Sequence, residues 1–102
     1  MGTTYKVVVK NVGERAKIKY LENSFDSFIK VLKGWPTINA LLFNDVSVYV
    51  GDSLDKPSTA KYNCSVNGLD FYGPIILAHE DMNGNMYDLT KDEINNIKVA
   101  LR

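Results

Sequence analysis

The sequence is poor in several residue types that define common classes of protein. It contains one cysteine, Cys64, and one histidine, His79. A single cysteine excludes an internal disulfide and a zinc site built from cysteines. There is no run of the ~18 consecutive apolar residues that a membrane-spanning helix needs. The first twenty residues alternate polar and apolar side chains, unlike the apolar block of a signal peptide. We therefore expect a cytoplasmic protein that does not enter a membrane.

Net charge is also absent, because 12 Lys and Arg balance 12 Asp and Glu. Neutrality argues against a mimic of DNA, which needs a dense negative surface, and against a general DNA coat, which needs a large basic excess. The charges are nevertheless segregated. Residues 1–34 hold seven cations and three acids, whereas residues 35–102 hold five cations and nine acids. This distribution predicts a basic end and an acidic end.

What the sequence does contain is an ordinary globular composition, with 45% hydrophobic and 24% charged residues in a chain of 102. This length and composition predict a single domain over residues 1–102. Short apolar or alternating runs separated by turn signals predict strands at residues 5–10, 15–20, 38–42, 46–50, 62–66, 74–79 and 86–89. Residues 51–60 are polar and contain Gly, Pro and Ser, which indicates a mobile surface loop.

Two segments show helix signals. Asn23 or Ser24 can cap a helix whose apolar stripe is Phe25, Phe28, Ile29 and Leu32, and Gly34 is the expected stop. Thr90-Lys91-Asp92-Glu93 has the form of a capping box before a second helix with Ile94, Ile97 and Leu101 on its apolar face. The sum is an α+β fold, with a mostly antiparallel sheet of about five to seven short strands and two helices.

The residues give little support for catalysis. His79 lies beside Glu80 and Asp81, a pairing that could transfer protons, but no serine or cysteine forms a nucleophile motif near it. We favour a solvated histidine at a strand end. Cys64, between Asn63 and Ser65, has no nearby cation that would lower its pKa, so we interpret it as a small half-buried residue. We expect a protein that is not an enzyme.

Cofactor and metal motifs are weak as well. Residues 81–85 begin like a calcium loop, but Met86 occupies the sixth position, where that loop requires glycine. A hairpin turn at Asn83-Gly84 is the preferred interpretation. The glycines have neither the spacing nor the following helix of a phosphate-binding loop. We expect neither a cofactor nor a metal.

A basic hairpin has the most specific functional alternative. Arg15, Lys17 and Lys19 alternate along one face of the second predicted strand, and we expect Lys6 and Lys10 beside them on the first. Such a ribbon could contact phosphates or enter a major groove. Lysines on an exposed strand also protect a sheet edge from aggregation. Because no aromatic side chain interleaves on that face, we favour a solvated face over a nucleic-acid face.

Aromatic residues make up 11% of the chain. Trp35, Phe71 and Tyr72 lie next to Gly or Pro in turn-like contexts, where rings often contribute to binding surfaces. They are the candidate partner surface. Closure of the core at the ends of the sheet is the competing interpretation.

Five short motifs occur in a characteristic order: Lys6-Val7-Val8-Val9, Leu21-Glu22-Asn23, Leu32-Lys33-Gly34, Phe71-Tyr72-Gly73-Pro74, and Asp88-Leu89-Thr90 followed by Glu93-Ile94. On these motifs the chain resembles an uncharacterised family of small proteins, a domain of unknown function carried by bacterial phages, plasmids and conjugative elements. The match spans about residues 5–97. It departs at Trp35-Pro36-Thr37 and in the polar middle loop. The resemblance implies an accessory protein of a mobile genetic element and carries over no catalytic residues.

We therefore expect a non-enzymatic phage or plasmid protein that acts by binding a host protein, in particular a component of host defence (counter-defence). Ten Asn and ten Lys against two Arg indicate a host of low GC content. Two alternatives stay open: a sponge for a small nucleotide signal at a subunit interface, and DNA binding through the basic hairpin. Strand edges at residues 62–66 or in the first hairpin could support a homo-oligomer.

Overall fold

Two helices and eight strands form within the part of the chain that the structure, a computed structural model, describes: residues 3–42, 46–52, 61–66, 68–81 and 83–101. In chain order the elements are β1 (Thr4–Lys10), β2 (Lys17–Glu22), α1 (Phe25–Leu32), β3 (Trp35–Leu42), β4 (Val46–Asp52), β5 (Tyr62–Val66), β6 (Leu69–Tyr72), β7 (Ile75–Glu80), β8 (Met86–Tyr87) and α2 (Lys91–Ala100).

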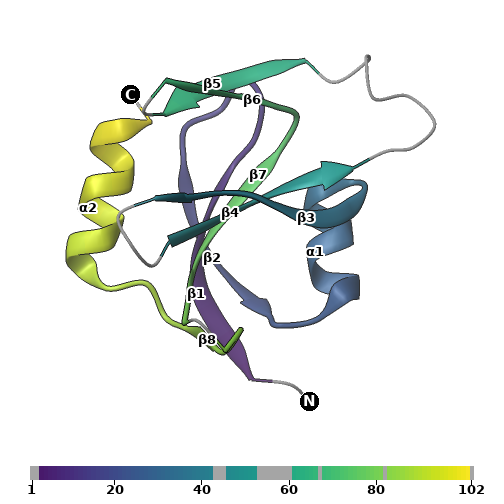
Figure 1. The fold of residues 1–102 in the computed structure, drawn as a ribbon, viewed down its shortest axis with the longest axis vertical. Coiled ribbons are helices and arrows are strands. Elements are labelled where there is room, and N and C mark those ends of the chain that lie inside the picture. Colours follow the sequence, from purple (N-terminus) through teal and green to yellow (C-terminus); the bar gives the residue numbers. More distant parts are fainter. Residues whose placement is uncertain (1–2, 43–45, 53–60, 67, 82, 102) are drawn as a thin grey trace.

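The strands form two antiparallel sheets (Figure 1). The larger has the order β2-β1-β7-β4-β3, with β8 also paired to β7, and the smaller is the β5–β6 hairpin. Strand β7 lies between the β1–β2 and β3–β4 hairpins, so β2 and β3 are the two outer edges. The predicted α+β class with a mostly antiparallel sheet is confirmed.

Each face of the large sheet is covered by different elements. On one face, Phe28 and Leu32 of α1 pack against Val7, Val9 and Ile76. On the other face, α2 and the β5–β6 hairpin bury a larger cluster, which includes Val8, Val48, Phe71, Leu77 and Ile97. The apolar run in β7 and the consecutive valines of β1 therefore serve both faces at once, as expected for strands near the centre of a sheet.

Helix α1 forms where its stripe predicts, with two differences at its ends. Ser24 caps it, and the Ser24 side chain accepts a hydrogen bond from the Ser27 backbone. The left-handed residue at its C-terminal end is Lys33 (φ 58°), not the predicted Gly34. Phe28 and Leu32 are buried, but Phe25 is 49% exposed and packs against Trp35 at the start of the edge strand β3. The stripe is therefore only partly a core face.

The C-terminal end of α1 lies close to β4. A Cβ atom placed on Gly51 would lie 2.6 Å from the backbone carbonyl oxygen of Leu32. Only glycine allows the helix to approach the strand this closely.

Helix α2 begins with the predicted capping box. The Thr90 hydroxyl accepts from the Glu93 backbone N–H, and the Glu93 carboxylate accepts from the Thr90 backbone N–H. Ile94, Ile97 and Leu101 are buried as expected.

Other segments differ from the prediction. Strand β6 was not predicted, because Phe71 and Tyr72 were placed in a turn-like context. Phe71 is 1% exposed and belongs to the core, which agrees with the competing interpretation of core closure. Strand β3 begins at Trp35, three residues earlier than predicted. Strand β2 begins at Lys17, two residues later than predicted. Of the loop predicted at 51–60, residues 51–52 belong to β4 and 53–60 lie outside the described residues. Residues 43–45, between the strands predicted at 38–42 and 46–50, also lie outside the described residues.

Candidate functional site

The five basic residues of the first hairpin do not share a face. Lys17 and Lys19 stand opposite Val9 and Val7 in the ladder, and these valines pack toward α1. Residues directly opposite in an antiparallel ladder project to the same side. The side chains of Lys17 and Lys19 therefore lie on the α1 side of the sheet.

Lys6 and Lys10 project to the opposite side. Lys6 stands opposite Tyr20, and both have the same parity as Val8, which packs toward α2. The expectation that they lie beside Lys17 and Lys19 is wrong. The cause is the register, in which even-numbered residues of β1 pair with even-numbered residues of β2, so that odd and even lysines separate. A single five-cation ribbon for a nucleic acid does not form.

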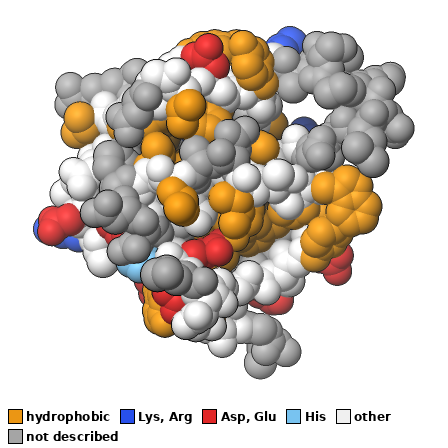
Figure 2. Space-filling view, viewed as in Figure 1, with side chains coloured by type: hydrophobic (Ala, Val, Ile, Leu, Met, Phe, Trp, Pro, Cys, Tyr) orange, Lys and Arg blue, Asp and Glu red, His pale blue; other side chains and the backbone are white. Residues whose placement is uncertain are grey.

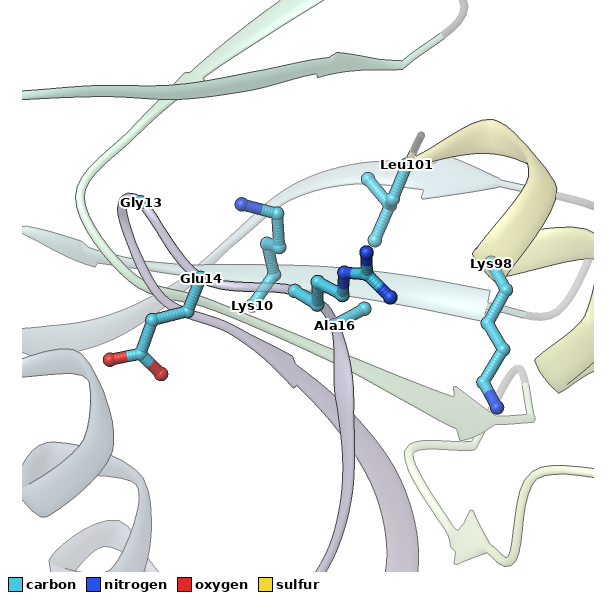
Figure 3. A pocket seen from close by; sticks show the side chains of 7 residues that line it. Lys10, Gly13, Glu14, Ala16, Lys98 and Leu101 are labelled. Carbon is cyan, nitrogen blue, oxygen red and sulfur yellow. The ribbon is translucent and has the colours of Figure 1, made fainter.

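Arg15 precedes β2 and contributes instead to a pocket on the α2 side. This pocket has a volume of about 780 Å³ and opens between the β1–β2 loop and the C-terminal end of α2 (Figure 3). Its described lining is Lys10, Gly13, Glu14, Arg15, Ala16, Lys98 and Leu101. The sequence alone did not single out Lys98, because nothing local relates the end of the last helix to the first hairpin.

The three aromatic candidates for a partner surface, like the five basic residues, do not lie together in the structure. Trp35 is 55% exposed at the start of β3. Phe71 is buried in the core, so it is not a surface residue, because its side chain points from the small hairpin into the larger cluster. Tyr72 is exposed on the small sheet, where its ring packs edge-on against Tyr62. Trp35 and Tyr72 thus belong to different sheets and do not form one patch.

Trp35 is one of several exposed apolar side chains on β3 and on the neighbouring first turn of α1. Its ring centroid lies 4.7 Å from that of Phe25. Farther along β3, Ile38 stands opposite Tyr49 and Leu41 opposite Ser47, which places both on the α1 side of the sheet. Phe25, Trp35, Ile38 and Leu41 are each between 49% and 65% exposed. We refer to these four residues as the β3 strip. Figure 2 shows hydrophobic side chains gathered over β3 and toward α1.

The sequence signal for this strip was present but unused. The eight residues of β3, WPTINALL, contain no charged side chain, although the strand is an edge of the sheet. Natural edge strands usually carry charge, proline or a bulge that prevents pairing with other chains. Here Pro36 removes one backbone donor, and the register shifts between Ile38 and Ala40. These two features interrupt the row of backbone groups without covering the side chains.

His79 is part of a tertiary contact, in contrast to the solvated histidine that we expected. Its Nδ1 lies 2.8 Å from Oε2 of Glu93, and the side chains are 22% and 15% exposed. Burial by itself raises the pKa of Glu93, but hydrogen bonds from the Thr90 backbone and from His79 outweigh it and hold the pKa below its usual value. The contact joins β7 to the first turn of α2. The acid that contacts His79 is fourteen residues away in the sequence, so the adjacent Glu80 and Asp81 did not indicate the true partner.

Glu80 and Cys64 are partly buried side chains that form, within the part of the chain that the structure describes, no tertiary contact like that of His79 with Glu93. Burial, and secondarily the nearby Asp81, raises the pKa of Glu80, and its Oε1 has no hydrogen-bond partner among the residues described. Burial also raises the pKa of the Cys64 thiol, while Lys10 acts in the opposite direction. Cys64 packs half-buried against the larger cluster, in agreement with the prediction.

The Asp81 loop is a hairpin turn. Asp81 Oδ1 accepts from the backbone N–H groups of Asn83 and Asn85, and Gly84 has φ 83°. In the described part of the chain, no three His, Cys, Asp or Glu side chains are arranged to hold a metal ion. Neither described helix is long and apolar enough to cross a membrane.

Comparison with protein-family models, with curated proteins and with solved structures finds no match. The function must therefore be inferred from the surfaces of the molecule.

Proposed function

We propose that this chain is a non-enzymatic binding protein that docks a partner protein on the β3 strip. The observation that carries the proposal is the exposure of three large apolar side chains on the uncharged edge strand β3, with exposed Phe25 of α1 against Trp35. Patches of this kind on a folded protein commonly mark interaction sites. Aromatic residues such as Trp35 are typical anchors of an interface.

The binding mode follows from the backbone of β3. Pro36 and the register shift after Ile38 interrupt a continuous ladder with an added strand. The partner would therefore be held by its side chains, packed over the Phe25–Trp35 pair and over Leu41. This mode leaves the protein protected from uncontrolled edge-to-edge association.

The resemblance noted in the sequence sets the biological context of the proposal. We propose a cytoplasmic accessory protein of a phage or other mobile element, with a host protein, such as a component of host defence, as the partner. DNA binding through the basic hairpin is not proposed, because its lysines are divided between two faces.

Two matched variants test the proposal. Leu41→Lys places a charge in the β3 strip, and Ile18→Lys places the same charge on β2, where Ile18 is 41% exposed. Tagged wild type and both variants are used for affinity capture from lysate of low-GC bacteria, with quantitative mass spectrometry. Circular dichroism checks that each variant is folded.

We expect a protein that is enriched by wild type and by Ile18→Lys and lost with Leu41→Lys. Loss of an interface anchor costs about 2 kcal/mol or more, or about thirtyfold in affinity. If no captured protein distinguishes Leu41→Lys from Ile18→Lys, the β3 strip is not the docking surface.

A further inference from the structure

The pocket between the first hairpin and α2 concentrates positive charge. Lys10 and Arg15 come from the start of the chain and Lys98 from the last helix, whereas Glu14 is the one acid in the described lining. Among the residues that the structure describes, the ion pairs are Lys17–Glu14 and His79–Glu93. Neither pair involves the three cations of the pocket.

Lys10 is the innermost of these cations. The residue is 7% exposed, and its ammonium donates to Asn63 Oδ1 at 2.9 Å and to the Asn11 carbonyl at 3.2 Å. Both acceptors are neutral. A lysine ammonium has three N–H donors, so these described contacts leave one for a ligand. Because a buried charge without an opposite charge is costly, an anion near Lys10 would stabilise it.

Asn63 holds this ammonium in place. Its Nδ2 donates to the Lys10 carbonyl at 2.9 Å and to the Gly73 carbonyl at 2.7 Å. With both N–H groups engaged, its Oδ1 is oriented toward the Lys10 amine. The β5–β6 hairpin thereby fixes Lys10 at the pocket in advance of binding, which lowers the entropy cost of holding a ligand.

Glu14 does not neutralise the pocket centre. Its carboxylate contacts Lys17 at 3.3 Å and Asn11 Nδ2 at 3.4 Å, and the Lys17 hydrogen bond is the main cause of its lowered pKa. Figure 3 shows the Glu14 carboxylate directed away from the Lys10 amine. The C-terminal end of α2 contributes partial negative charge, which Lys98 in its last turn offsets.

We propose that this pocket binds a small phosphate-bearing anion. Arg15 supplies a planar fork suited to two oxygens of one phosphate group, and Lys10 and Lys98 supply point charges. The volume of about 780 Å³ is in the range of small-molecule sites. The described lining contains no aromatic side chain for stacking on a base, so the phosphate groups are the recognised part of the ligand. This site is independent of the β3 strip.

Titration with inorganic pyrophosphate at low salt tests the proposal, with binding followed by two-dimensional NMR of the labelled full chain. The pocket variants are Arg15→Gln and Lys98→Gln. The control is Lys19→Gln, which removes one charge from the same hairpin but on the α1 side. Each removed residue is exposed, so all three variants should fold.

We expect saturable shifts at Gly13, Ala16 and Leu101. Each pocket variant should weaken binding about tenfold, as loss of a charged hydrogen bond predicts, and Lys19→Gln should change it less than about twofold. Equal weakening by Lys19→Gln, or no saturable shift, would overturn the site. A short single-stranded oligonucleotide serves as a second probe. If it binds more tightly than pyrophosphate and is weakened by the same variants, the assignment to a small anion is wrong.

Discussion

The two outer strands of the large sheet, β2 and β3, are protected against pairing with other chains in different ways. In β2, Lys17, Lys19 and Glu22 place charge at three of six positions. In β3, none of eight positions is charged, and Pro36 and the register shift after Ile38 interrupt the backbone instead. An exposed sheet edge needs some such protection against pairing with other chains.

The difference has a functional meaning. Charge on a strand makes its side chains as well as its backbone unfavourable for a protein partner. Proline and a bulge affect only the backbone, so the side chains beside them stay available. The β3 edge is therefore protected from strand pairing while its apolar side chains stay exposed, whereas the α1 side of β2 is charged.

The largest expected effect comes from Gly51, which stands opposite Pro36 in β4. Gly51→Ala places a Cβ against the backbone of Leu32, which α1 can relieve only by moving away from β4. We expect a loss of about 2–3 kcal/mol in the free energy of unfolding, measured by urea denaturation.

The matched control is Gly13→Ala, in the loop before β2. Gly13 has φ 76° and no atom within 4 Å of an added Cβ, so only backbone strain of about 1–2 kcal/mol applies. Equal losses for the two variants would show that α1 does not depend on the close approach at Gly51.

Acid should lower the free energy of unfolding through Glu93, whose contact with His79 lies on the central strand β7 and not on either outer strand. The pKa of Glu93 is depressed in the fold, so its contribution is full above its unfolded pKa near 4.5 and is lost as the pH falls through the lower folded value. Glu93→Gln should cost about 1–2 kcal/mol at pH 7 and flatten the acid limb of the stability curve. The measurement is urea unfolding between pH 7 and pH 3, and an unchanged acid limb would contradict the stabilising role of the Glu93 carboxylate, which accepts from the Thr90 backbone and contacts His79.

A smaller difference in stability is expected between alanine variants of the exposed aromatic residues on β3 and β2. Trp35→Ala removes the contact with Phe25 and should cost about 1 kcal/mol. Tyr20→Ala on β2, where Tyr20 is 60% exposed, should cost less than about 0.5 kcal/mol. Thermal unfolding followed by circular dichroism compares them, and the order reversed would mean that the Phe25–Trp35 pair has no structural role.

The smallest effect concerns the ion pair beside β2. Glu14 and Lys17 are about half exposed, so solvent and salt screen their attraction. Glu14→Gln should leave the unfolding midpoint unchanged within error at physiological salt. A clear destabilisation would show that charge stabilises the β2 edge in addition to protecting it.

Local signals predicted most of the fold. The capping box at Thr90 and the apolar stripe around Phe28 depend on residues within one or two helical turns, and the structure confirms both helices. Strand β6 was missed because its four residues lie next to the Gly73-Pro74 turn signal, and the packing of the small hairpin on the sheet decides between the surface and the core interpretation of Phe71.

The candidate sites depend on long-range geometry and were predicted less well. Which lysines share a face follows from the register between β1 and β2, which sequence alternation within one strand does not determine. The partners of His79 and Lys10 are 14 and 53 residues away. Trp35 was recognised, but its neighbours Phe25, Ile38 and Leu41 were first assigned to the core or to a short strand.

The position of β7 has a consequence for folding during synthesis. The first two hairpins of the chain do not pair with each other, since β7 fills the place between β1 and β4. Until residues 75–80 leave the ribosome, each hairpin has an additional unpaired side and no completed core beneath it. Domains assembled from such distant segments fold slowly and expose apolar surface meanwhile. A nascent chain of this protein should therefore expose unpaired strand edges until residues 75–80 have been translated.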